Sequence, residues 1–143
     1  MLQRICHGDE MMALIIRADY EAEGIEFFTP DEFSQQVAYM NRPRDYVIPP
    51  HVHNPVTRSV SYTKEVLFIR SGRLRVDFYN DDQTYLHSTV LNAGDVIFLA
   101  TGGHGFEMLE DTQIIEVKQG PYAGDDDKTR FNPVSPDQIR MLD

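Results

Sequence analysis

Two histidines, His51 and His53, stand one residue apart, and a glutamate, Glu65, follows them at the start of an apolar run. Because alternate residues of a strand point to the same face, the two imidazoles can aim at one point. If Glu65 faces inward, Leu67 and Ile69 face inward with it, so its carboxylate lies among apolar side chains. Burying a charge without a partner is very costly, and a divalent metal shared with the two histidines is a suitable partner.

A third histidine, His104, follows a glycine-rich break and begins another expected strand. Three imidazoles and one carboxylate suit a divalent transition metal such as Fe, Mn, Ni, Cu or Zn. Four protein ligands leave room for water or substrate in a five- or six-coordinate site. For any single histidine the alternative is an ordinary hydrogen-bonded residue. His7 and His87 have no motif neighbour, and we expect neither of them to be a ligand.

Short runs with alternating apolar residues, separated by turns, dominate the middle of the chain. The run from Arg73 to Tyr79 alternates cleanly, and the polar residues after it have the composition of a turn. The expected strands span residues 13–17, 37–41, 65–70, 73–79, 85–91, 96–99, 104–109 and 113–118. Strands of this length, without helices between them, predict an all-β fold that is an antiparallel sandwich or barrel.

One short helix is expected in the N-terminal part of the chain. Thr29 can cap it, Pro30 suits its first turn, and Glu32 completes a capping box. The predicted helix covers roughly residues 30–35.

The composition limits the class of partner. With 13 basic and 23 acidic residues the chain has a net charge of -10, which disfavours phosphate backbones and makes nucleic acid an unexpected partner. The single cysteine cannot form an internal disulfide. No apolar run approaches the length of a membrane span or has the flanks of a secretory signal. We therefore expect a cytoplasmic protein of one domain.

The spacing of these residues resembles the two motifs of the cupin superfamily. In the first motif, a His-x-His pair is followed by a glutamate and, after six further residues, by a glycine, here Glu65 and Gly72. In the second, a glycine precedes a histidine across a short turn, here Gly94 and His104. The resemblance covers roughly residues 37–119.

The match also has departures. Asp45 stands at the first glycine of the first motif, Ala100 at the proline of the second, and Met108 where asparagine is common. Eleven residues separate His53 from Glu65, where the family has three or four, so the loop before Glu65 carries an insertion.

The resemblance implies a single cupin jelly-roll β-barrel with a short N-terminal helix. We divide the chain into an N-terminal segment that packs on the barrel (residues 1–36), the barrel itself (37–120) and a C-terminal tail (121–143). The metal ligands that the resemblance implies are His51, His53, Glu65 and His104.

A narrower likeness is to small cupin-fold metalloproteins associated with bacterial surface-polysaccharide gene clusters. The segments that carry it are residues 65–68, 72–76, 115–122 and 127–128.

Several other residues are candidates for lining the pocket. If His104 faces inward, its strand neighbours two and four residues on do so too, and cationic side chains can hold a substrate carboxylate or phosphate. The candidate substrate-binding residues are Tyr39, Arg42, Phe106, Met108 and Lys118. The expected ligand is a small polar molecule, such as a sugar, a sugar nucleotide or an oxo acid.

Two classes of function remain open. The chain is either a metal-dependent enzyme (an isomerase, an epimerase or a dioxygenase) or a non-catalytic cupin that binds or senses a metabolite. A third reading is a structural cupin whose metal site is empty. We expect a homodimer, in which the N-terminal segment is a candidate packing strand.

Overall fold

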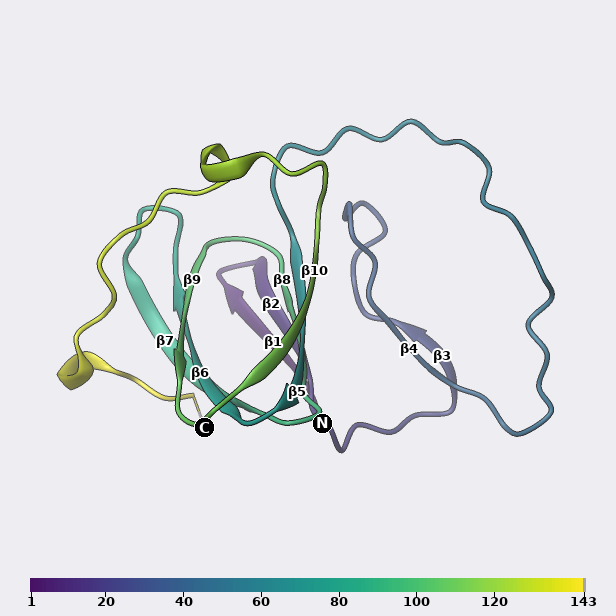
Figure 1. The fold of residues 1–143 in the computed structure, drawn as a ribbon, viewed down its shortest axis with the longest axis horizontal. Helices are drawn as coiled ribbons and strands as arrows, with labels where there is room; N and C mark the ends of the chain where they lie inside the picture. The colour runs from purple at the N-terminus through teal and green to yellow at the C-terminus, as the bar shows by residue number, and fades with distance from the viewer. Residues whose placement is uncertain (143) are drawn as a thin grey trace. The chain divides into compact units, whose positions relative to one another are not determined.

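Ten strands carry the fold of the computed structural model, which describes residues 1–142 (Figure 1). They are β1 (Leu2–His7), β2 (Glu10–Ile16), β3 (Gly24–Phe27), β4 (Ala38–Asn41), β5 (Glu65–Ser71), β6 (Arg73–Tyr79), β7 (Tyr85–Asn92), β8 (Val96–Leu99), β9 (Gly103–Met108) and β10 (Gln113–Lys118). Two short 3-10 helices, η1 (Gly124–Asp127) and η2 (Pro136–Gln138), lie in the C-terminal tail. The prediction of a mainly β protein is confirmed.

Most of the strands are where the alternating runs placed them. The strands expected from residue 37 onward each lie within one residue of the predicted bounds, from β4 to β10. The strand expected over residues 13–17 is β2, which begins three residues earlier, and β1 and β3 were not expected.

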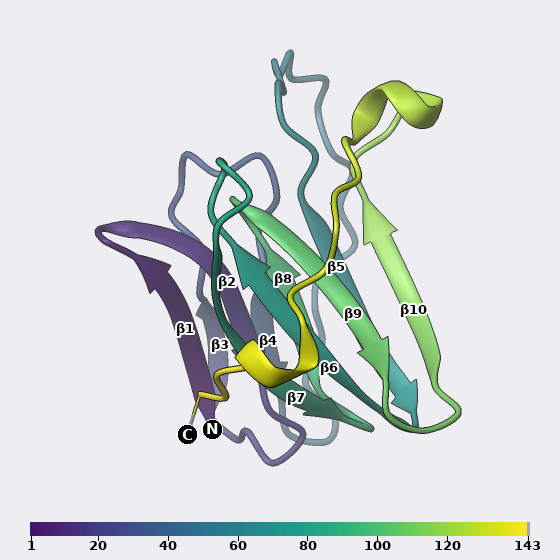
Figure 2. The same ribbon diagram turned by 90° about the vertical axis from the view of Figure 1, so that its left-hand side faces the viewer.

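The strands divide between two compact units. One consists of residues 1–20 and 63–142, and the other of residues 21–62. The first unit holds a five-stranded sheet in the order β1-β2-β8-β5-β10 and a three-stranded sheet in the order β7-β6-β9. All pairings in both sheets are antiparallel. Figure 2 shows the strands of the first unit from a second direction, at 90° to the view of Figure 1.

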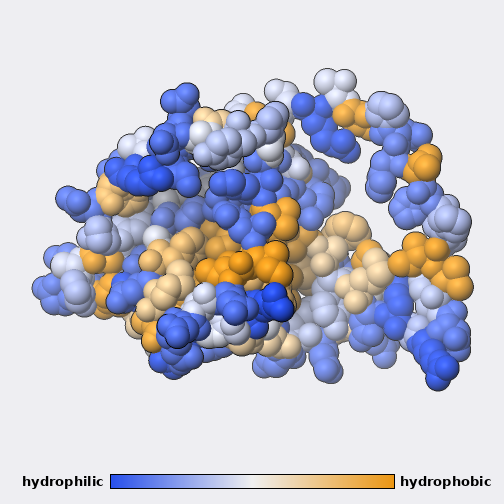
Figure 3. Space-filling view, in the orientation of Figure 1, coloured by the Kyte–Doolittle hydropathy of each residue, from blue (hydrophilic) through white to orange (hydrophobic). Residues whose placement is uncertain are grey.

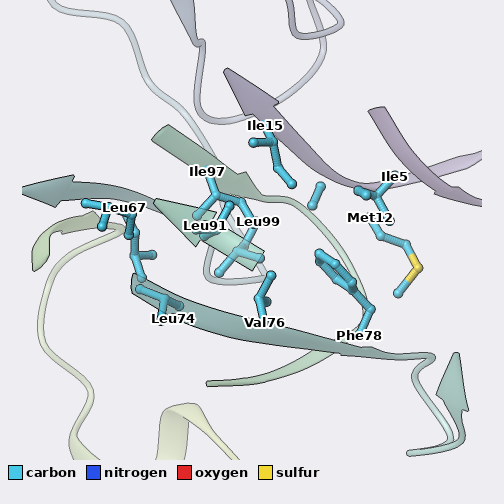
Figure 4. Close-up of a cluster of buried hydrophobic side chains, with 12 residues drawn as sticks. Ile5, Met12, Ile15, Leu67, Leu74, Val76, Phe78, Leu91, Ile97 and Leu99 are labelled. Carbon is cyan, nitrogen blue, oxygen red and sulfur yellow. The ribbon is translucent and has the colours of Figure 1, made fainter. Parts of the chain in front are cut away.

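The hydrophobic core of the first unit lies between these two sheets (Figure 4). Alternation along the strands supplies it: Leu74, Val76 and Phe78 of β6 are fully buried, and Leu67 and Ile69 of β5 belong to the same cluster.

A buried ion pair joins two turns of the first unit. The guanidinium of Arg17 lies 2.9 Å from the Asp95 carboxylate, and the two side chains are 17% and 4% exposed. The same carboxylate accepts hydrogen bonds from the backbone N–H groups of Ala18 and Asn92. It therefore fixes the end of β2 against the turn between β7 and β8.

The expected N-terminal helix is wrong, because local hydrogen bonds build a different turn there. The Gln36 side-chain amide donates to the carbonyls of Pro30 and Phe33, and its oxygen accepts from the Thr29 hydroxyl. Thr29 Oγ1 in turn accepts from the N–H of Val37, not from a residue three positions on as in a capping box. The segment becomes a side-chain-closed turn between β3 and β4, the two-stranded hairpin of the second unit.

The sheets do not close into a barrel. Among the described residues β10 and β1 are the edges of the larger sheet, and β7 and β9 those of the smaller one. The predicted boundaries at residues 36 and 120 stay predictions. The predicted tail lies along β6 and β7, where the hydroxyl of Tyr79 accepts the N–H of Val134 and the backbone of Ser88 bonds Arg140 and Leu142.

The face drawn in Figure 3 carries mainly hydrophilic residues, in blue, with a group of hydrophobic residues, in orange, near its centre. Within residues 1–142, none of the helices has the length and apolar character that crossing a membrane demands.

Candidate functional site

Glu65 and His104 meet across the two sheets of the first unit. Glu65 is the first residue of β5 in the larger sheet, and His104 is the second residue of β9 in the smaller one. His104 Nε2 lies 3.1 Å from Glu65 Oε2, with the side chains 30% and 13% exposed. Two of the four predicted metal ligands, 39 positions apart in the sequence, are therefore brought together by these strands.

Strand register directs both side chains toward the interior. His104 is paired with Phe78 of β6, whose side chain is buried in the core. Glu65 lies two and four residues before Leu67 and Ile69, which also belong to the core, so all three share one face of β5.

The environment of Glu65 favours its ionised form. The hydrogen bond from His104 is the largest influence and holds the pKa of the Glu65 carboxyl below its ordinary value, although partial burial acts in the opposite direction. The positive charge of Lys118, which is paired with Glu65 across β5 and β10, adds to the lowering of this pKa. The carboxylate is thus held deprotonated, as a metal ligand must be.

The Glu65–His104 pair fits the donor chemistry of a borderline divalent metal. Imidazole nitrogen and carboxylate oxygen bind such ions at about 2.0–2.2 Å, so two donors at right angles on one ion lie about 3 Å apart. The observed separation of 3.1 Å matches that spacing. The same separation serves a direct hydrogen bond, in which a protonated Nε2 donates to the carboxylate.

His51 and His53 belong to the second unit and also stand together. Their ring centroids are 5.2 Å apart in an edge-to-face arrangement. His51 Nδ1 lies 3.0 Å from the carbonyl oxygen of Pro49, a contact that leaves Nε2 for a ligand. Metal-binding histidines commonly donate their second ring N–H to a backbone carbonyl in this way.

Strand alternation, from which the common direction of these two imidazoles was predicted, does not apply in this segment. Residues 42–64 form no strand, and both side chains are exposed. Pro49 and Pro50 immediately precede the pair and cannot donate to a sheet ladder, which accounts for the irregular backbone. Within residues 1–142, no three histidine, cysteine or carboxylate side chains form a ready-made metal cluster. That all four predicted ligands share one ion stays a prediction.

The other predicted site residues fall into two groups. Phe106 shares the inward face of β9 with His104, and their rings are 5.4 Å apart, while Met108 on the same face is half-exposed. Lys118 ends β10 beside Glu65. Tyr39 and Arg42 lie in the second unit, where the Arg42 guanidinium stacks 4.6 Å from the ring centroid of Tyr46.

Sequence reasoning missed three features near the pair. Lys64 donates from Nζ to the carbonyl of Ala100, which ties the start of β5 to the end of β8. A side-chain hydrogen bond with Glu116 also lowers the pKa of Glu65. A pocket of about 210 Å³ lies where β10 runs into the tail. Its lining includes residues 121–122 and 127–128, which the narrower family likeness had already marked.

Comparisons of the chain with family models, curated proteins and solved structures give no match.

Proposed function

We propose that this chain is a metal-binding cupin that acts on a small polar metabolite. The metal is a divalent transition ion, Fe, Mn, Ni, Cu or Zn, and its ligands are His51, His53, His104 and Glu65. The observation that carries the proposal is the Glu65–His104 pair, because two donors predicted from motif spacing alone lie 3.1 Å apart on facing sheets.

The turns of the first unit support a cupin-type jelly roll as the underlying fold. Gly72 and Gly94, the glycines of the two motifs, have φ values of 82° and 89°, which residues with a side chain rarely adopt. At Gly72 an added Cβ meets the carbonyl oxygen of Asp111 at 2.2 Å. The backbone conformation at these two motif positions therefore favours glycine over any residue with a side chain.

The side chains around the pair define what the protein contributes to a reaction. Glu65 and His104 hold each other in fixed orientation, Phe106 places an apolar wall beside the imidazole, and Lys118 offers a cation for an anionic substrate group. When bound, the metal supplies Lewis-acid polarisation for an isomerase or epimerase, or redox chemistry for a dioxygenase.

We place the substrate among sugars, sugar nucleotides and small oxo acids, with a role in bacterial surface-polysaccharide biosynthesis. This follows from the short likeness at residues 115–122 and 127–128. We also propose a cytoplasmic location.

Metal content tests the proposal. Protein purified without added metal is expected to contain about one equivalent of a transition ion by elemental analysis. His104→Ala and Glu65→Gln lower metal affinity by at least about tenfold, whereas the exposed controls His7→Ala and Glu110→Gln leave it unchanged. Thermal unfolding of each variant shows whether a lower metal content reflects a lost ligand or an unfolded protein. Equal metal content in all four variants contradicts the proposal.

Substrate turnover then separates the enzyme from the non-catalytic alternative. Metal-loaded protein is incubated with candidate sugar nucleotides and oxo acids, and products and oxygen uptake are followed. A ligand that raises the melting temperature but is recovered unchanged after long incubation assigns the chain to metabolite binding instead.

A further inference from the structure

The pocket at the junction of β10 and the tail lies wholly within the first unit. It has a volume of about 210 Å³ and is lined by side chains from residue 118 to residue 130. The charged and aromatic side chains that line it are Lys118, Tyr122, Asp125, Asp127, Lys128 and Arg130. The 3-10 helix η1 curls the tail back and so brings Lys128 and Arg130 to the end of β10.

The acidic side chains of the pocket are already engaged. Asp127 accepts a hydrogen bond from the Thr63 hydroxyl, and Asp125 lies 3.5 Å from the Arg130 guanidinium. Lys118 and Lys128, in contrast, form no ion pair with any residue that the structure describes. In a chain with a net charge of -10, a pocket lined by three cationic side chains and two carboxylates carries a local excess of positive charge.

We propose that this pocket binds the phosphate group of a small phosphorylated ligand. Lysine binds phosphate as a strong point charge, and the pocket places Lys118 and Lys128 around one small volume beside Arg130, whose guanidinium also pairs with Asp125. The volume lies below the roughly 300–1,000 Å³ of pockets that enclose drug-sized ligands, so it suits one anionic group, not a whole nucleotide. Tyr122, which is 88% exposed, offers a ring face to whatever the phosphate carries.

The position of Lys118 connects this pocket to the candidate metal site. Lys118 is paired with Glu65 across the strands, so a phosphate at Lys118 sits beside the Glu65–His104 pair. If the proposed function holds, a phosphate site at this position narrows the substrate class to phosphorylated sugars and sugar nucleotides. The phosphate site itself requires no metal and is testable without one.

The experiment is a titration of metal-free, chelator-treated protein with inorganic phosphate, followed by ¹⁵N-¹H NMR. Saturable shifts are expected in the amides of residues 118–130. The double variant Lys118→Gln/Lys128→Gln is expected to weaken phosphate binding by about tenfold or more in Kd, because it removes two charged hydrogen-bond donors from the pocket. Arg4→Gln/Arg70→Gln, with the same change in net charge at exposed residues outside the pocket, is expected to leave the Kd unchanged.

Three results overturn the inference. They are non-saturable shifts, equal weakening in the two double variants, and acetate binding as tightly as phosphate, which assigns the pocket to carboxylates. The protein in this titration is metal-free, so the result for phosphate does not depend on whether the chain binds a metal. The metal content, in turn, does not depend on whether the pocket binds phosphate.

Discussion

At Gly72 the backbone turns from β5 into β6 with a φ of 82°, and an added Cβ meets Asp111 O at 2.2 Å and Thr112 Oγ1 at 2.6 Å. Gly72→Ala is therefore expected to lower the free energy of unfolding by about 2 kcal/mol or more, since the conformation alone costs roughly 1–2 kcal/mol. Chemical denaturation measures the loss.

Two glycines serve as matched controls for Gly72. Gly8 also has a positive φ but no atom within 4 Å of an added Cβ, so Gly8→Ala reports the conformational cost alone. Gly120 has neither feature, and Gly120→Ala is expected to be near neutral. Equal losses in Gly72→Ala and Gly8→Ala would show that the close approach to Asp111 carries no weight.

His87 on β7 gives the fold a dependence on pH that is separate from the candidate metal site. Its Nδ1 is buried without a hydrogen-bond partner among the described residues, and its ring packs on Phe78. Burial lowers the pKa of His87 below its ordinary value of 6.5, against the opposing effect of a hydrogen bond with its own backbone, and the charges of Arg140 and His7 add smaller contributions to the lowering.

Because the folded state binds this proton less readily than the unfolded state, the His87 contribution to stability is complete above pH 6.5. It is lost as the pH falls through the lowered pKa. Urea unfolding at pH 7.5 and pH 5 is expected to show a larger loss of stability for the wild type than for His87→Gln. Parallel pH profiles for the two proteins would remove His87 from this role.

At the scale of elements, the Arg17–Asp95 pair holds the end of β2 against the turn before β8. Asp95→Asn leaves the Arg17 guanidinium partly buried without its counter-charge, and breaking a buried pair costs about 3–5 kcal/mol. Arg73→Gln, which breaks the exposed pair with Glu110, is expected to cost less than about 1 kcal/mol. Comparable losses in the two variants, measured by denaturation, would argue against the structural role of Asp95.

Strand alternation is local, and this is why β5 to β10 could be predicted from the sequence. In contrast, β1 has little apolar alternation and depends on its pairing with β2, and β3 has four residues, three of them exposed. The expected helix failed because the Gln36 side chain competes for the carbonyls of that turn.

The same reasoning separates the two halves of the candidate site. Glu65 and His104 lie on regular strands, where period-two alternation applies, and the resemblance to the cupin motifs named both of them as ligands. His51 and His53 lie in a proline-containing segment without a strand, where alternation does not apply, and the pocket at Lys118 forms by the return of the tail, which no local pattern encodes.

At the scale of the whole molecule, a homodimer stays our expectation. β1 is an edge of the five-stranded sheet with no second partner among residues 1–142, and an edge strand offers unpaired backbone groups to a second copy. Light scattering at micromolar concentration is expected to give twice the chain mass of 16.5 kDa. Ile5→Lys is unsuitable as a test because Ile5 is buried in the core. Arg4→Pro is the better test of pairing through β1, because Arg4 is exposed and proline removes a backbone N–H from the edge strand. A monomeric wild type, or an unchanged dimer in Arg4→Pro, contradicts pairing through β1.

The proposed function requires three imidazoles and one carboxylate to bind one metal ion. The most direct measurement is a crystal structure of the metal-loaded protein with anomalous data at the edge of the bound metal. We predict one anomalous peak about 2.0–2.2 Å from nitrogens of His51, His53 and His104 and from a Glu65 oxygen. A structure in which these side chains lie too far apart to share a peak would contradict the account.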